Sequence, residues 1–323
     1  MPMEDAGVQD ALECLTRLRT GLRGNHPAPN QPCLLLAILC EIQSGHIRSP
    51  EVTIDTRLIV RYCDLYEIAT GERGNANPWL PLWALRRRDG PGGPLWMPRY
   101  SQALSGVAEQ LGQPKSMRQL EERFTTARLA PELFETLSDD TGAREASAVL
   151  IGCYFAHSPS AQGALHDAMA EAMVSGAYER RLDEPDEAAH EPPETYEAGR
   201  SAAFRRLVLE AYDYRCAASR RRFITPDYRY LAEAAHLIPF AESGDDRPCN
   251  GLALTPDLHW AMDNHLIAPG PDLRWHISSA VDPLVEDNRW LHRLHGTELH
   301  LPRHERHRPS PEGLHWRMTH LLR

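Results

Sequence analysis

Four side chains in the last third of the chain have types and spacing that could perform hydrolytic chemistry. His236 ends an apolar run, where an imidazole could act as a general base. Asn250 begins an Asn-Gly pair, and its amide could hydrogen-bond across a loop to hold the histidine-bearing segment in place. His259 precedes Asp263 by four residues. On a helix this spacing puts both side chains on one face, where they could share a cation.

Together these groups match the needs of phosphodiester hydrolysis, which requires a base to deprotonate water and a cation to stabilise the developing negative charge. Glu233 could supply a further ligand, although an ideal strand would place it on the face opposite His236. Each residue alone has a common structural explanation, such as a hydrogen-bonded core histidine or an Asn-Gly turn. Their order within one short segment favours the catalytic interpretation.

The surrounding pattern predicts that a hairpin, a loop and a helix position these groups. Thr255 is a suitable N-cap for a helix that includes His259 and Asp263. Before it, glycine, aspartate and proline are frequent, as is typical of a loop. The expected segments are an amphipathic helix over 200–212, strands near 214–217 and 231–237, and a loop over 239–250.

Several parts of this region closely resemble the HNH endonuclease family, namely residues 204–217, 233–239, 244–254 and 259–267. The resemblance covers nearly all of residues 200–323, and residues 309–317 are similar to the terminal helix of these proteins. It implies a ββα-metal fold and double-stranded DNA as substrate, cut to leave 5′-phosphate ends. It also implies one divalent cation, Mg²⁺ or Mn²⁺, with Zn²⁺ or Ni²⁺ as alternatives because a ligand is nitrogen.

The same resemblance implies roles for individual residues. His236 would be the general base, Asn250 the residue that fixes the loop, and His259 a metal ligand. The familiar form of the motif has a metal-binding acid directly before the first histidine, where this chain has Ala235. The expected carboxylate ligand is therefore Asp263, with Glu233 in reserve.

The first part of the chain predicts a mainly α domain. Its Pro- and Gly-rich stretch from 75 to 98 contains Trp79, Trp83 and Trp96, which could be core aromatics or recognition residues. An acidic segment with several prolines, residues 183–199, predicts a linker. The expected class is α+β, with an α-rich domain over 1–182 and a nuclease domain over 200–323. Helices of the first domain are expected over 11–22, 32–43, 116–129, 131–137, 143–154 and 162–182.

Segments 26–37, 80–85 and 89–96 resemble the sulfur-binding domain of modification-dependent restriction endonucleases that recognise phosphorothioated DNA. The resemblance spans residues 12–155. It implies an apolar pocket that includes Leu80, Pro81 and Ala84, and a DNA contact by His26. Pro27 and Leu80 depart from the arginine and tyrosine expected there. The arginines next to the pocket could bind phosphates, namely Arg86, Arg87 and Arg88.

The composition of the chain argues against a membrane protein and against a secreted protein. The net charge of −10 is uneven, because residues 200–323 hold 17 arginines against 16 acidic residues. No apolar run approaches the roughly 20 residues of a membrane span. Seven dispersed cysteines argue against a secreted disulfide framework. We therefore expect a cytoplasmic enzyme without a membrane partner, able to form a homodimer. The alternatives are a signal-activated antiphage nuclease effector and a catalytically silent protein that binds modified DNA.

Overall fold

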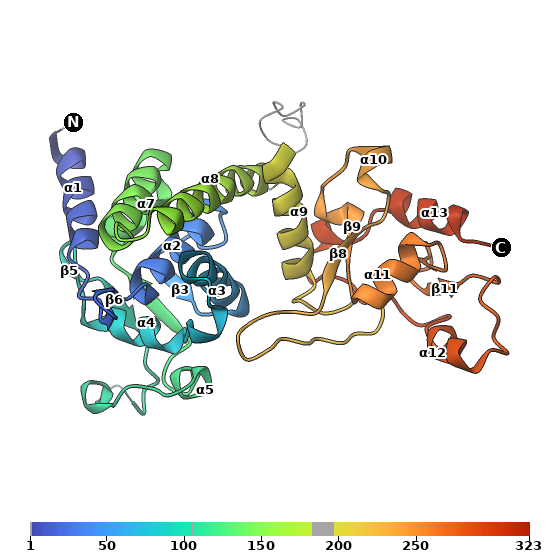
Figure 1. Cartoon of the computed structure of the whole chain (residues 1–323), viewed down its shortest axis with the longest axis horizontal. Helices are drawn as coiled ribbons and strands as arrows, with labels where there is room; N and C mark the ends of the chain where they lie inside the picture. The colour runs from blue at the N-terminus through green and yellow to red at the C-terminus, as the bar shows by residue number, and fades with distance from the viewer. Residues whose placement is uncertain (1, 105, 183–196) are drawn as a thin grey trace. The chain divides into compact units, whose positions relative to one another are not determined.

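The computed structural model describes residues 2–104, 106–182 and 197–323. The chain divides into two compact units, residues 1–193 and 194–323 (Figure 1). Helices and small antiparallel sheets occur together, consistent with the expected α+β class. Most of the predicted linker, residues 183–196, lies outside the described residues, and helix α9 begins at Glu197.

The core of the first unit is helix α2, Asn30–Gln43, whose residues from Gln31 onward are all buried. Pro32 lies in its first turn, where the missing N–H breaks no helical hydrogen bond. Helices α3, α7 and α8 pack against α2. The helices of this unit are α1 Pro2–Thr16, α3 Thr56–Thr70, α4 Trp79–Ala84, α5 Met117–Glu121, α6 Pro131–Ser138, α7 Asp140–Tyr154 and α8 Pro159–Leu182.

Two of the helices predicted for this unit are wrong in part. The helix expected over 116–129 ends at Glu121, and Thr126–Leu129 is strand β7, which lies between β3 (Glu51–Thr53) and β6 (Trp96–Pro98). Tertiary pairing on both sides overrides the local helical pattern there. The helix expected over 11–22 ends at Thr16, because Leu22–Arg23 (β1) pairs with His26–Pro27 (β2). The other predicted helices are confirmed within a few residues.

The second unit is built around a two-stranded hairpin and the helix that follows it. Strand β8, Glu233–His236, pairs antiparallel with β9, Gly251–Leu254, and the register places His236 opposite Gly251. Helix α11, Pro256–Asp263, comes next, with Thr255 at its N-cap position. The helix after the hairpin is as predicted, but the expected order of hairpin, loop and helix is wrong, because the loop lies between the two strands, and the strand expected at 214–217 is absent. Those residues contribute only the isolated bridge between Arg215 and Arg222.

Helix α9, Glu197–Ala211, packs against the hairpin. A Cβ atom on Gly251 would lie 2.4 Å from Val208 Cγ2 and 2.8 Å from the Phe204 ring, so this close approach requires glycine. The C-terminal helix α13, Pro311–His320, matches the predicted terminal helix. The remaining elements of the unit are α10 Phe240–Ser243, β10 Ile267–Pro269, β11 Trp275–Ile277 and α12 Arg289–His292. Among the residues described, none of the helices could span a membrane.

Candidate active site

His236 lies at the end of β8 with a carboxylate on one side of its ring. Its Nε2 is 2.9 Å from Oδ1 of Asp246, whose side chain is only 5% exposed. The ring also stacks on Phe204 of α9, with centroids 3.8 Å apart and planes 9° apart. A carboxylate only accepts hydrogen bonds, so Nε2 carries the proton and Nδ1 is the basic nitrogen. Nδ1 makes no hydrogen bond within the described part of the chain.

Asn250 closes the loop that joins the two strands. Its amide is buried, with 1% of the residue exposed. The side-chain oxygen accepts a hydrogen bond from the N–H of Ile238, and the NH₂ group donates to the carbonyls of Ile238 and Asp245, all at 2.9 Å. These bonds fix the loop next to Asp246 and so hold the carboxylate that contacts His236. This geometry suits the loop-fixing role expected for Asn250.

His259 on α11 has a carboxylate at each ring nitrogen. Its Nδ1 is 2.9 Å from Oε2 of Glu233 on β8, and its Nε2 is 3.2 Å from Oδ2 of Asp263, one helical turn away. The hydrogen bond to Asp263 raises the pKa of His259; partial burial opposes this rise and the bond to Glu233 reinforces it. Partial burial tends to raise the pKa of Asp263, but His259 and Arg317 outweigh it and lower that pKa. The structure therefore brings together the three predicted metal-binding residues, on two sides of one imidazole.

Arg317 on α13 connects the two histidine sites. It is 2% exposed, and its guanidinium donates to the main-chain oxygens of His236 at 2.6 Å and Met262 at 2.9 Å. The same group is 3.2 Å from Oδ1 of Asp263. The sequence did not single out Arg317 or Asp246 for these roles. The available signals were weak: Asp246 lies inside a segment of the family resemblance, and Arg317 lies at the end of the predicted terminal helix.

The donors at His259 suit a hard or borderline divalent cation, because an imidazole nitrogen lies beside a carboxylate oxygen. The two carboxylates contact different ring nitrogens, so only one of them can share an ion with a given nitrogen. Across residues 2–104, 106–182 and 197–323, no group of three or more histidine, cysteine or acidic side chains has the arrangement of a complete metal site. A cation here would take its remaining ligands from water or substrate.

Comparison with known proteins addresses this part of the chain directly. Residues 216–268, which contain the hairpin, the loop and helix α11, match a family model described as HNH endonuclease. We call the second unit, residues 194–323, the HNH domain after this match. This match supports an enzyme that hydrolyses DNA. HNH nucleases generally use a divalent metal, consistent with the donor set at His259.

Two further comparisons concern the whole chain. No curated protein matches it significantly. A solved structure titled "Modification dependent TagI restriction endonuclease" is similar at 20% sequence identity, with a TM-score of 0.31. The match covers 41% of this chain and 44% of that one, so the chain spans less than half of the protein it matches.

Outside the HNH domain, the first unit contains a cavity of about 510 Å³. Its wall combines apolar side chains, amides and arginines without a carboxylate. Six of the seven residues predicted to contact DNA line it, namely Leu80, Pro81, Ala84, Arg86, Arg87 and Arg88. The seventh, His26, does not line this cavity; its ring stacks on His157 with centroids 4.2 Å apart.

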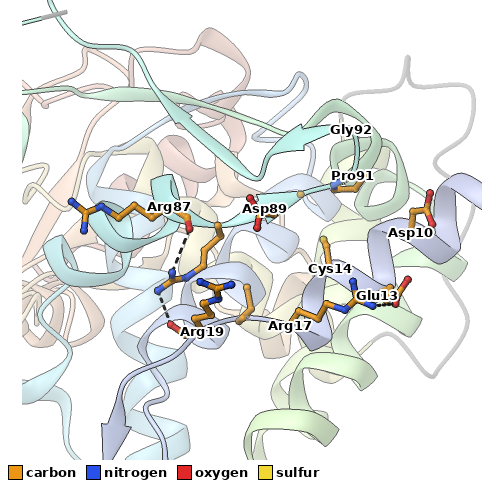
Figure 2. A pocket seen from close by; sticks show the side chains of 12 residues that line it. Asp10, Glu13, Cys14, Arg17, Arg19, Arg87, Asp89, Pro91 and Gly92 are labelled. Carbon is orange, nitrogen blue, oxygen red and sulfur yellow. Dashed lines mark hydrogen bonds and ion pairs between the residues drawn. The ribbon is translucent and has the colours of Figure 1, made fainter. Parts of the chain in front are cut away.

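A second cavity, of about 460 Å³, shares Arg87 and Arg88 with the first (Figure 2). Arg88 connects its own segment of the chain to two others. Its guanidinium donates to the side-chain oxygen of Gln31 at 2.9 Å and to the carbonyl of Arg19 at 2.6 Å. Burial lowers the pKa of Arg88, and the nearby charges of Arg19 and Arg87 lower it further. Arg87 and Arg88 thus line both cavities, and Arg19 lines the second.

The tryptophans of this region have different environments. Trp96 is fully buried and belongs to the core. Trp83 is also largely buried, at the wall of the larger cavity, with the Arg86 guanidinium 3.6 Å and the Arg123 guanidinium 4.6 Å from its ring centre. Trp79 is half-buried. Of the two interpretations left open by the sequence, the core role therefore holds for Trp96, while Trp83 contributes to a cationic cavity.

Proposed function

We propose that the protein is a modification-dependent restriction-type endonuclease, in which the first unit reads duplex DNA and the HNH domain cuts it. The observation that carries the proposal is the cavity that gathers six of the residues expected to contact DNA. Its apolar wall at Leu80, Pro81 and Ala84 offers a dry surface to a weakly hydrated group such as sulfur or methyl. The arginines beside it supply phosphate contacts.

The HNH domain would use His236 as its general base. Nδ1 takes a proton from water, and the resulting hydroxide attacks phosphorus while the bond to the 3′ oxygen breaks, which leaves a 5′-phosphate end. The Asp246 carboxylate holds Nε2–H and stabilises the imidazolium that forms. Stacking on Phe204 keeps the ring in this orientation.

A divalent cation, Mg²⁺ or Mn²⁺ with Zn²⁺ or Ni²⁺ as alternatives, would be held by His259 and Asp263. The nitrogen concerned is Nε2, because it lies at the outer end of the ring while Nδ1 lies next to Cβ and is already bound by Glu233. Glu233 would then orient the imidazole from its other nitrogen. When bound, the cation supplies charge stabilisation for the attacked phosphate and the leaving oxygen.

The choice between the two carboxylates can be tested with Asp263→Asn and Glu233→Gln. Loss of a direct ligand should shift the Mn²⁺ activation curve to higher concentration more than loss of an orienting carboxylate, which typically weakens metal affinity about 10- to 100-fold. Thermal melting of both variants controls for folding, because Asp263 also pairs with buried Arg317. If Asp263→Asn leaves the curve unchanged and Glu233→Gln shifts it, the assignment is reversed.

Modification dependence is tested by cleavage of matched plasmids that carry no mark, phosphorothioate or methylated bases. The proposal expects one marked plasmid to be cut at least about tenfold faster than the unmarked one, the discrimination that one favourable apolar contact can provide. Equal cleavage of all the plasmids would contradict the proposal that the cavity recognises modified DNA, and would not affect the HNH assignment.

A further inference from the structure

Between α9 and β8 the chain forms a narrow two-legged loop, residues 219–231, which we name the arm; Figure 1 shows it as a long excursion between these elements. An isolated bridge joins Ile224 to Tyr230 across the two legs. At the turn, the N–H of Thr225 donates to the carbonyl of Arg229 at 2.8 Å, and Tyr228 adopts a left-handed conformation with φ of 62°. The arm is therefore an ordered element rather than an open loop.

The base of the arm is fixed to the end of α9. Arg222 donates through Nε to the carbonyl of Asp213 at 2.8 Å and is 3.2 Å from its carboxylate. The rings of Tyr214 and Tyr230 pack together with centroids 4.9 Å apart. Because these contacts restrict the legs before any ligand arrives, binding by the arm costs little ordering entropy.

Two large apolar side chains on the arm remain in solvent. Phe223 is 60% exposed and Leu231 is 45% exposed. The N–H of Leu231 donates to the carbonyl of Phe223 at 3.1 Å, so the two residues lie beside each other on opposite legs. An exposed pair of large apolar side chains on an arm with this many arginines is a feature of a contact surface.

The charge of the arm indicates what it contacts. Its 13 residues include four arginines and one aspartate. Arg220 and Arg229 pair with Glu298 and Asp227, whereas no ion pair involves Arg221 in the part of the chain that the structure describes. A polyanion complements this surface.

The position of the arm connects it with DNA cleavage. Leu231 lies two residues before Glu233, the side chain that binds His259, so the arm continues directly into the catalytic strand. Over that distance an extended chain spans about 7 Å. The polyanion that reaches the arm is therefore the DNA held for cutting.

We infer that Phe223 and Leu231 form a wedge that enters the minor groove beside the cut site and bends the duplex, while Arg221 binds a backbone phosphate. Apolar side chains inserted between base steps, with arginines alongside, are an established way to bend DNA. The inference rests on the proposed DNA-cutting activity of the HNH domain and does not require modification-dependent reading. The wedge would expose the backbone of the bent strand to His236.

The test uses the full-length chain with His236→Ala, which prevents cutting, and a short duplex labelled at both ends for energy transfer. Binding should raise the transfer efficiency, and Phe223→Ala combined with Leu231→Ala should remove this rise and weaken affinity at least about tenfold. Leu284→Ala is the matched control, because Leu284 is 87% exposed in the same unit and lies outside the arm. Phe223→Leu should keep most of the bend, since it keeps an apolar wedge.

Arg221→Gln should reduce the slope of log affinity against log salt by about one unit. Melting curves of all the variants confirm that they are folded. The inference is overturned if the double variant bends DNA as the parent does, if Leu284→Ala loses the bend equally, or if the parent leaves the duplex straight.

Discussion

His236 and His259 have different partners, and those partners suit different tasks. His236 contacts one nearly buried carboxylate through Nε2, which leaves Nδ1 to accept a proton. His259 has a carboxylate at each ring nitrogen. The hydrogen bond to Asp263 is the largest cause of the raised pKa of His259. A cation that binds this imidazole must displace its proton, and the Asp263 carboxylate beside Nε2 could share the ion. The separation of base and ligand thus follows from the local contacts of each ring.

At this scale the Asp246 contact can be tested by Asp246→Asn. The amide can donate to Nε2 and so favour the tautomer with the proton on Nδ1, which removes the base without changing the side-chain shape. We expect the cleavage rate to fall about 10²-fold. Single-turnover nicking measures this loss.

Asp245→Asn is the matched control for that substitution, because the neighbouring carboxylate pairs with Arg247 instead of His236. The control should keep most of the activity. Equal losses in the two variants would assign the effect to the loop as a whole and contradict the role of Asp246.

The sequence identified the histidines and the asparagine because their types and order are informative without knowledge of the fold. It could not identify their supporting residues. Asp246 reaches His236 across a loop, and Arg317 reaches it from 81 residues away. Such contacts depend on tertiary packing and leave no periodic pattern. Their assignment required the three-dimensional arrangement of the loop and of α13.

Among the helices and strands, close packing against α9 keeps the hairpin in place. The sequence predicted strand β8 but paired it with the wrong segment, because β9 is buried at every position and so lacks the alternation of a half-exposed strand. Strand β7 was missed for a different reason. It is a four-residue segment that two neighbouring strands stabilise, and its local pattern was taken for a continuation of α5.

Gly251→Ala tests this packing. The added methyl would meet Val208 and Phe204, and overpacking of this kind costs about 1–3 kcal/mol. Because Phe204 stacks on His236, we also expect cleavage to fall in the folded variant. Denaturant unfolding and nicking assays measure the two effects.

Gly152→Ala provides the comparison, because Gly152 lies in helix α7 with nothing within 4 Å of an added Cβ. That change should be neutral or slightly stabilising, by up to about 1 kcal/mol. If the Gly251 variant is as stable and active as the Gly152 variant, the hairpin does not depend on close contact with α9.

At the scale of the whole molecule, the two units carry different chemistry. The HNH domain holds the proposed base and the proposed metal-binding side chains, and the first unit holds a cationic cavity despite the acidic balance of its sequence. Six of the residues that line this cavity are ones that the family resemblance singled out. The sequence did not predict the second cavity, because Arg19 reaches Arg87 and Arg88 only through the folded chain.

Arg87 and Arg88 should respond differently to substitution. Arg87 lines both cavities, so Arg87→Ala should weaken DNA binding and reduce the salt slope by about one unit without loss of stability. Arg88→Ala should destabilise the fold, since it removes the bonds to Gln31 and Arg19. Binding titrations at several salt concentrations, made in the His236→Ala chain, separate the two effects.

Arg144 on α7 is exposed and lies outside both cavities, so Arg144→Ala serves as the reference for loss of a surface charge. A salt slope that changes as much for Arg144→Ala as for Arg87→Ala would show that the cavity arginines contribute only general surface charge.

Single-turnover cleavage of plasmid DNA in Mn²⁺ by the wild-type chain and by His236→Ala tests directly whether His236 is the base. We predict that the variant binds DNA with nearly unchanged affinity, melts at nearly the same temperature, and cuts at least about 10²-fold more slowly, because the base is removed. A folded His236→Ala protein that nicks DNA at close to the wild-type rate would contradict this prediction.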